Sequence, residues 1–162
     1  MAERCFGCTR GTKGSNKALT EEIVLDSSVI VSAFVQGDRF RNQARRVMKK
    51  VFDGEYSMIE SSIVPVEVCG SISRRAGVKP ASLAQRQLLR WEEIGVMRFA
   101  ELTRKRKNEA VDLAIELQIR GMDAIILQVA KENSCGLATF DEEMASKVRK
   151  LVKVFIQEDF GA

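Results

Sequence analysis

From Glu22 onward, two patterns of apolar residues alternate along the chain. Consecutive apolar residues indicate buried strands, and apolar residues spaced three and four apart indicate helices. The expected strands are Ile23–Leu25, Tyr56–Ile59, Val96–Leu102, Ser134–Phe140 and Val152–Ile156. The expected helices run from about Arg39 to Phe52, from Ser61 or Ser62 to Gly77, from Pro80 to Gly95, from Asn108 to Arg120, from Met122 to Lys131 and around Met144–Val148. Because parallel strands need crossover connections, this alternation predicts an α/β fold, with a central parallel sheet of about five strands and helices on both faces.

The first apolar run, Glu22–Val35, is interrupted by Asp26 and two serines. The run is typical of a strand buried on both faces of a parallel sheet. An ionised carboxylate is costly in such a setting, so we expect Asp26 to lie where Ile23–Leu25 ends and a cleft begins. The alternative is that Asp26 or Ser27 caps a helix that begins near Val29.

The chain has 162 residues, 45% of them hydrophobic and 30% charged, which indicates one globular domain. Residues 1–20 contain three glycines among polar residues, so we expect a flexible leader followed by a domain over residues 21–162. No apolar stretch approaches the roughly 20 residues that span a bilayer. The N-terminus also lacks the apolar core of a signal peptide, so we expect no membrane association and a cytoplasmic location.

Histidine is absent from the sequence, which restricts the chemistry open to an enzyme. Nucleophiles paired with histidine, histidine-ligated zinc and imidazole acid–base catalysis are all excluded. The net charge of +4 is compatible with a polyanionic partner but does not identify one. Carboxylates therefore become the main candidates for catalysis.

The four cysteines do not form a disulfide framework. Cys5 and Cys8 form a Cys-x-x-Cys motif in the leader, where a reducible pair is the favoured interpretation. Cys69 and Cys135 lie in apolar contexts and are expected to act as small buried residues. A zinc site made by all four is the alternative, although a second Cys-x-x-Cys is missing.

Four acids stand out by their positions relative to the predicted elements. Asp26 follows the first strand, Glu67 lies early in a helix, Asp123 opens the helix after Gly121, and Asp141 ends the fourth strand. The carboxyl ends of parallel strands meet at one crevice, so these acids can converge. Crowded carboxylates need a counter-charge, and ligands that are all oxygen suit Mg²⁺ or Mn²⁺.

Each acid also has an ordinary structural interpretation. Glu67 could be a solvated helix residue, Asp123 a first-turn acid favoured by the helix dipole, and Asp141 the cap of the following helix. With Asp26 as a helix cap, these make four ordinary interpretations. We favour less the hypothesis that all four hold at once in this order.

The ordered set of motifs resembles the PIN-domain nucleases. The matching segments are Val24–Ser28, Glu67 within Val64–Val68, Gly121–Ala124 with the apolar helix behind it, and Ala138–Asp141. They span roughly Ile23–Ile156, nearly the whole chain after the leader. The Cys5–Cys8 leader has no counterpart in the family pattern, and Glu142 and Glu143 leave open which acid beside Asp141 contributes.

The resemblance implies a PIN-like nuclease domain that hydrolyses RNA with Mg²⁺ or Mn²⁺. It makes Asp26, Glu67, Asp123 and Asp141 the catalytic, metal-binding acids, with the Ser28 and Thr139 hydroxyls in support. It also implies a homodimer, for which apolar residues of the Pro80–Gly95 helix, including Trp91, are candidate contacts. Two settings stay open: a toxin with a small antitoxin protein as partner, or an RNA-processing factor.

Basic residues supply candidate RNA contacts. Arg39, Arg41 and Arg45 follow the segment that carries Asp26 and are the favoured phosphate contacts. The run Arg104–Lys107 precedes a predicted helix, where the dipole disfavours positive charge, so we expect a solvated loop there. No run of interleaved aromatic residues predicts a stacking platform.

Two other classes of function compete with the nuclease. A non-catalytic RNA-binding or scaffold protein could keep the fold, but it would have no reason to hold four clustered acids. A phosphatase that forms an aspartyl-phosphate is less favoured, because Ser28 stands where such enzymes carry a second acid two positions after the first.

Overall fold

The structure is a computed structural model that describes residues 20–161. The predicted leader therefore lies, apart from Thr20, outside the described residues, and so do Cys5 and Cys8. The strands are β1 Glu21–Leu25, β2 Tyr56–Ser61, β3 Met97–Ala100, β4 Gly136–Ala138 and β5 Val154–Phe155. The helices are α1 Ser27–Phe34, α2 Arg41–Phe52, α3 Val64–Ala76, α4 Val78–Glu93, α5 Arg104–Leu117, α6 Gly121–Glu132 and α7 Glu142–Val148, followed by the 3₁₀ helix η1 Gln157–Phe160.

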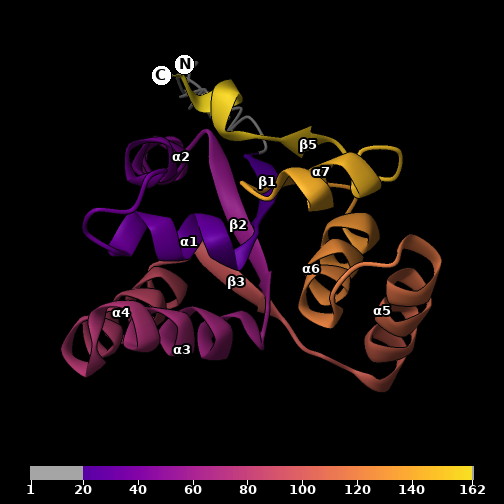
Figure 1. Ribbon diagram of the computed structural model, residues 1–162, viewed down its shortest axis with the longest axis horizontal. Coiled ribbons are helices and arrows are strands. Elements are labelled where there is room, and N and C mark those ends of the chain that lie inside the picture. Colours follow the sequence, from indigo (N-terminus) through magenta and orange to yellow (C-terminus); the bar gives the residue numbers. More distant parts are fainter. Residues whose placement is uncertain (1–19, 162) are drawn as a thin grey trace, which may run out of the picture.

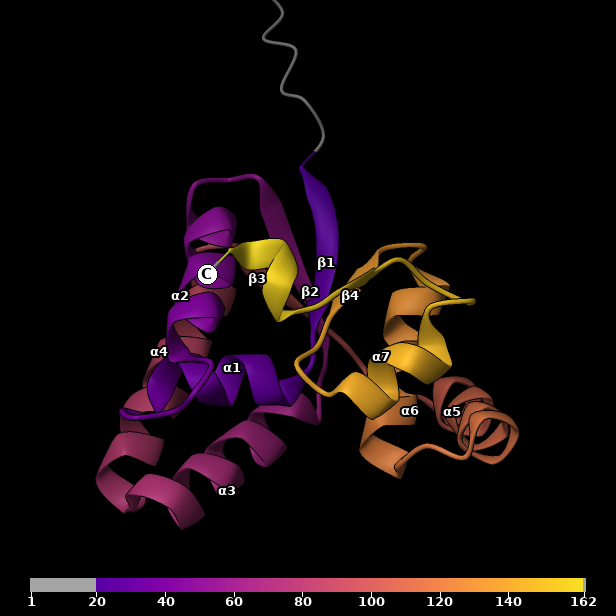
Figure 2. The same cartoon turned by 45° about the horizontal axis from the view of Figure 1, so that its top comes forward.

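The five strands form one parallel sheet in the order β3-β2-β1-β4-β5, which confirms the predicted α/β architecture. Helices α1 to α4 lie on one side of the sheet and α5 to α7 on the other (Figure 1). Strand β1 lies in the interior of the sheet, between β2 and β4 (Figure 2). Its residues Ile23, Val24 and Leu25 have no exposed surface, as expected for a strand covered on both faces.

The apolar run Glu22–Val35 is not one strand. It contains β1 and, after Asp26, the helix α1, in which Val29, Ile30 and Val31 are also buried. Because a buried helix and a buried strand are both apolar, the run does not mark the boundary between them. The helix proposed as the alternative therefore exists, and it begins at Ser27.

The prediction that Arg104–Lys107 forms a loop is wrong, because these residues make the first turn of α5. The Thr103 hydroxyl caps this turn by accepting a hydrogen bond from the Arg106 N–H group (3.3 Å). The Arg106 guanidinium also donates to the Glu132 carboxylate (2.6 Å) and to the Glu101 carbonyl (2.8 Å). These local bonds outweigh the unfavourable helix dipole.

Several other boundaries differ by a few residues. Strands β3, β4 and β5 are shorter than predicted, because apolar residues continue past the last backbone pairs. Helix α4 begins at Val78 rather than Pro80, directly after Gly77, whose φ of 95° separates it from α3. In the described part of the chain, no helix is long and apolar enough to cross a membrane.

Candidate active site

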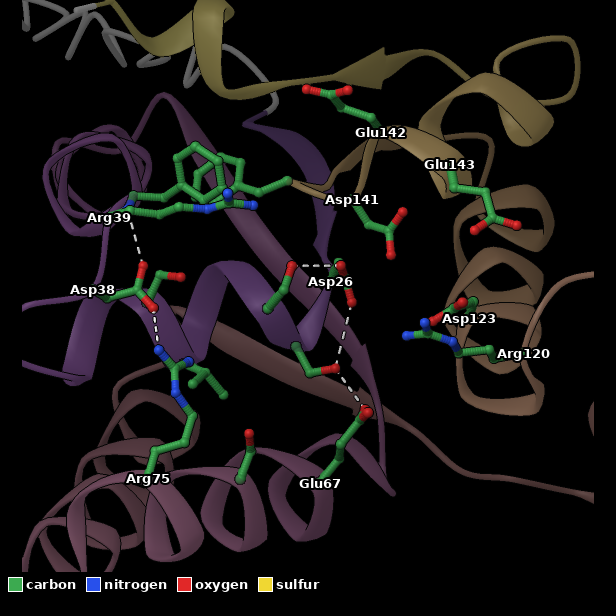
Figure 3. A pocket seen from close by; sticks show the side chains of 17 residues that line it. Asp26, Asp38, Arg39, Glu67, Arg75, Arg120, Asp123, Asp141, Glu142 and Glu143 are labelled. Atoms are coloured by element: carbon green, nitrogen blue, oxygen red, sulfur yellow. Dashed lines mark hydrogen bonds and ion pairs between the residues drawn. The ribbon is translucent and has the colours of Figure 1, made fainter.

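A pocket of about 690 Å³ opens at the carboxyl ends of β1 and β4. It contains all four acids singled out in the sequence, so the topology brings residues from four separate segments to one place (Figure 3). We call it the acidic pocket. Its charged lining residues are Asp26, Asp38, Glu67, Asp123, Asp141, Glu142, Glu143, Arg39, Arg75 and Arg120.

Asp26 is the most enclosed of these acids, with 5% of its surface exposed. It occupies the junction between β1 and α1, and its N–H group donates to the Ala138 carbonyl on β4 (2.8 Å). Its Oδ2 atom accepts hydrogen bonds from the hydroxyls of Ser28 (2.6 Å) and Thr139 (2.8 Å). Ser28 and Thr139 thus lie where the sequence interpretation placed them, and they fix the direction of the carboxylate.

Glu67 lies in the first turn of α3. Its Oε2 atom accepts a hydrogen bond from the Ser27 hydroxyl (2.5 Å), and Ser27 also lies 3.4 Å from Oδ1 of Asp26. Glu67 is therefore tied to the pocket, and it is not a solvated helix residue. Ser27, which the sequence interpretation considered only as a helix cap, is the link between the two acids.

Asp123 lies in the first turn of α6, half-buried, and faces the same space. Burial and the charges of Asp26, Asp141 and Glu67, opposed by the Arg120 guanidinium, together raise its pKa to about 6. Three carboxylates thus act on the fourth across the pocket, which is the mutual repulsion expected of acids that share one site.

Asp141 has two roles in the structure. Its Oδ1 atom accepts a hydrogen bond from the Met144 N–H group (3.0 Å), so it caps α7, as the alternative interpretation held. Its own N–H group donates to the Thr139 hydroxyl (3.1 Å), and its carboxylate faces the acidic pocket (Figure 3). Capping and a place in the pocket are therefore compatible.

Glu60 is a buried acid that the sequence interpretation missed. It lies on β2 with no exposed surface, and its Oε1 atom accepts a hydrogen bond from the Leu25 N–H group (2.8 Å). Burial and the nearby charge of Asp26 raise its pKa well above the usual range. The signal was present: an acid follows Met58 and Ile59 in an apolar strand, the same pattern that drew attention to Asp26.

The cationic side chains do not all lie where they were expected. Arg39 lines the acidic pocket, whereas Arg41 and Arg45 are absent from its lining, and Arg45 lies beside an apolar groove between α1, α2 and α4. Arg75 and Arg120 were not singled out in the sequence, yet both line the pocket. They approach from the end of α3 and the start of α6.

The donor set fits a hard divalent cation. Every candidate ligand in the acidic pocket is an oxygen atom, and Mg²⁺ is commonly held by one or two carboxylates together with substrate phosphates. Within residues 20–161, no three acidic or cysteine side chains lie close enough to bind one ion as they stand. The pocket therefore offers oxygen ligands only, in carboxylates that face one another without forming a closed cage.

The zinc site considered for all four cysteines includes Cys5 and Cys8, which lie outside the described residues. Cys135 is buried beside β4 and Cys69 is half-buried in α3. Burial raises the pKa of both thiols, to about 11 for Cys135. Thiols held protonated in this way behave as small apolar residues, as predicted.

Comparisons with known proteins agree with this architecture. A family model described as the PIN domain matches residues 23–150. A comparison with curated protein sequences finds no match.

Among solved structures, the chain resembles VapC20 of Mycobacterium tuberculosis, described as a toxin that cleaves the sarcin–ricin loop, with 19% identity, a TM-score of 0.64, and coverage of 76% of this chain and 93% of that one. It also resembles VapBC2 of Rickettsia felis, solved with a DNA fragment from their promoter (15% identity, TM-score 0.60, coverage 83% and 98%). FitAcB of Neisseria gonorrhoeae is a third similar structure (17% identity, TM-score 0.57, coverage 83% and 97%).

Proposed function

The chain belongs to the PIN domain family, and from this premise we propose that it is a metal-dependent endoribonuclease. The proposed substrate is RNA, and the proposed cofactor is Mg²⁺ or Mn²⁺. Asp26, Glu67, Asp123 and Asp141 would hold the ion and carry the chemistry. The observation that most supports the proposal is geometric: four acids from separate segments line one pocket, where the charge of Asp26 adds to burial in raising the pKa of Asp123.

The neighbours of each acid suggest how the protein prepares the reaction. Ser28 and Thr139 donate to one oxygen of Asp26, Oδ2, whereas its other oxygen, Oδ1, has only the longer contact with the Ser27 hydroxyl (3.4 Å). Ser27 orients Glu67 in the same way. Side chains held by hydrogen bonds need little rearrangement when a ligand binds. A bound divalent ion would supply Lewis-acid polarisation of the phosphodiester.

The biological setting is proposed from the similar structures. VapC20 is a toxin that cleaves an RNA element, so a toxin role, with a small antitoxin protein as partner, is our first proposal for this chain. An RNA-processing role is the second. Both place the protein where RNA is handled, so we propose a cytoplasmic location.

A metal titration with a panel of RNAs tests the proposed activity. We expect cleavage that requires Mg²⁺ or Mn²⁺ and is lost with a chelator. Asp26→Asn keeps the shape of the side chain and should abolish cleavage. Asp112→Asn removes one negative charge from an exposed position of α5 outside the acidic pocket and should cleave like the wild type. Bound but uncleaved RNA under all metal conditions would instead favour the non-catalytic RNA-binding protein.

A further inference from the structure

We propose that Arg39, supported by Phe40 and Phe140, is a nucleobase-binding site of the acidic pocket, on which an unpaired base of single-stranded RNA stacks. The inference rests on the proposed nuclease function, and it adds a contact of the pocket with a base of the RNA to the phosphate contacts already expected. Unpaired bases stack on aromatic rings and on arginine guanidinium planes.

Two aromatic residues far apart in the sequence meet at this wall of the pocket. Phe40 precedes α2 and Phe140 follows β4, and their ring centroids are 5.3 Å apart with the planes inclined at 53°. Both line the acidic pocket. The stacking platform that no run of aromatic residues predicted is therefore assembled by the fold.

Arg39 extends this stack toward the acids. Its guanidinium carbon lies 4.4 Å from the centroid of the Phe40 ring, a cation–π contact. Figure 3 shows the Arg39 side chain stretched along one wall of the pocket, with its guanidinium end on the side of Asp141. One face of the guanidinium is covered by Phe40, and Arg39 itself is exposed, so a second planar group can stack on the other face.

The segment that carries Arg39 is held in place from both sides. The Asp38 carboxylate accepts hydrogen bonds from the Phe40 N–H group (2.9 Å) and from the Arg75 guanidinium. Burial acts to raise the pKa of Asp38, but the hydrogen bonds to Arg75 and Phe40 together lower it. Asp38 thus anchors the backbone on either side of Arg39, and an anchored contact residue costs less to order when RNA binds.

Arg39 also differs from the other arginines of the pocket in its contacts with acids. Arg75 is paired with Asp38, and Arg120 acts on Asp123. Within residues 20–161, the Arg39 guanidinium forms no ion pair and no hydrogen bond to a carboxylate. Its planar face is therefore available to a substrate without breaking a protein contact.

Lysine separates stacking from charge, because Arg39→Lys keeps the positive charge but removes the plane. The test compares the wild type, Arg39→Lys and Arg39→Ala in metal-free binding, measured by fluorescence anisotropy at fixed ionic strength. The two single-stranded probes are an oligoadenylate and an abasic ribose-phosphate chain of the same length. Arg86→Lys, at an exposed position of α4 outside the pocket, is the matched control. Circular dichroism checks that each variant is folded.

We expect Arg39→Lys to bind the oligoadenylate roughly tenfold more weakly and the abasic chain like the wild type, a loss in the range of one stacked base. Arg39→Ala should weaken both, and Arg86→Lys neither. Equal losses of affinity for both probes, or wild-type affinity of Arg39→Lys for the oligoadenylate, would overturn the stacking site. If the wild type still cleaves RNA with metal, the proposed nuclease function stands. A wild type that neither binds nor cleaves RNA would overturn both.

Discussion

At the scale of single residues, Glu60 is an acid buried beneath the pocket with one oxygen bonded and the other without a partner among the described residues. Its pKa is higher in the folded protein than in the unfolded chain, so folding takes up a proton. The stability contributed by Glu60 is therefore fully present below the unfolded pKa of about 4.5 and falls as the pH rises above it.

Glu60→Gln keeps an acceptor for the Leu25 N–H group but has no charge to bury. We expect this variant to be more stable than the wild type at about pH 8 and equal to it at about pH 4. Urea denaturation at the two pH values measures the difference. Glu60→Leu is the control: it leaves the Leu25 N–H group unpaired and should cost about 1–3 kcal/mol relative to the wild type at about pH 4, and less at about pH 8, where Glu60 itself contributes less. A Gln variant that is weaker than the wild type at high pH would show that Glu60 is charged and compensated.

Folding also raises the pKa of Asp123, which is less buried than Glu60. Its pKa of about 6 lies above the usual 3.8, so in metal-free protein its contribution to stability falls as the pH rises through this interval. Asp123→Asn should flatten that dependence and should be no less stable than the wild type. Differential scanning fluorimetry in chelator, across about pH 4 to 7, measures it.

We expect a divalent ion to make the wild type more stable than Asp123→Asn. Mg²⁺ or Mn²⁺ bound to the folded state raises the melting temperature of the wild type, and much less that of Asp123→Asn. Because a proton competes with the ion for the carboxylate, the wild-type response should grow as the pH rises past 6. Equal responses to metal in both proteins would exclude Asp123 from the ion site.

At the scale of elements, Asp141 combines a helix cap with a candidate ligand, and two substitutions separate these roles. Asp141→Ala removes the acceptor for the Met144 N–H group and should cost about 1 kcal/mol in metal-free protein. Asp141→Asn keeps the cap and should cost little. Both should weaken the stabilisation by metal. Urea denaturation in chelator and in excess Mg²⁺ gives the unfolding free energy of each variant in the two conditions. If Mg²⁺ stabilises both variants as much as the wild type, Asp141 acts only as a helix cap.

Strand β4 is packed tightly against β5 at Gly136. A Cβ atom added there would lie 2.5 Å from Cε2 of Phe155, closer than packed atoms approach. Gly136→Ala should therefore cost about 1–3 kcal/mol through overpacking. Phe155→Leu should recover part of that loss in the double variant, measured by a double-mutant cycle in urea. If the stability losses of the two single variants simply add in the double variant, the contact with Phe155 is not the cause of the Gly136→Ala loss.

The alternation of strands and helices, and the position of each of the four acids next to an element end, were predictable because hydrophobic periodicity is a local signal. The parallel sheet then brings these positions to one pocket. Boundaries were less predictable: α1 is as apolar as β1, and the basic first turn of α5 depends on Thr103 and on an ion pair with Glu132. The stack of Arg39, Phe40 and Phe140 could not be predicted, since it depends on a tertiary contact between distant segments.

At the scale of the whole molecule, the predicted role of Trp91 in a dimer interface is not supported. Trp91 is 4% exposed, and its ring lies 5.7 Å from that of Phe34 and 5.6 Å from that of Phe52. It belongs to the packing of α4 on α1 and α2. The exposed apolar residues of the same helix include Leu83 and Leu89, each 53% exposed.

A homodimer through α4 stays our proposal, now placed on these leucines. Leu83→Glu or Leu89→Glu would bury a charge in the interface and should give a monomer, measured by light scattering across a concentration series. Ile115→Glu, on α5 at the other side of the sheet, is the matched control and should leave the dimer intact. Loss of the dimer in the Ile115 variant alone would move the interface to α5.

Strand order also affects when activity can arise during synthesis. Asp26 is made early, but its carboxylate is held by Thr139, 113 positions later, and its backbone by Ala138. Pairings so distant in sequence form late, and on a ribosome they must wait until β4 has been translated. A nascent or truncated chain that ends before β4 carries Asp26 without the hydroxyl that orients it. A nuclease built this way would lack an oriented Asp26 carboxylate until β4 and Thr139 have been translated and have folded beside β1.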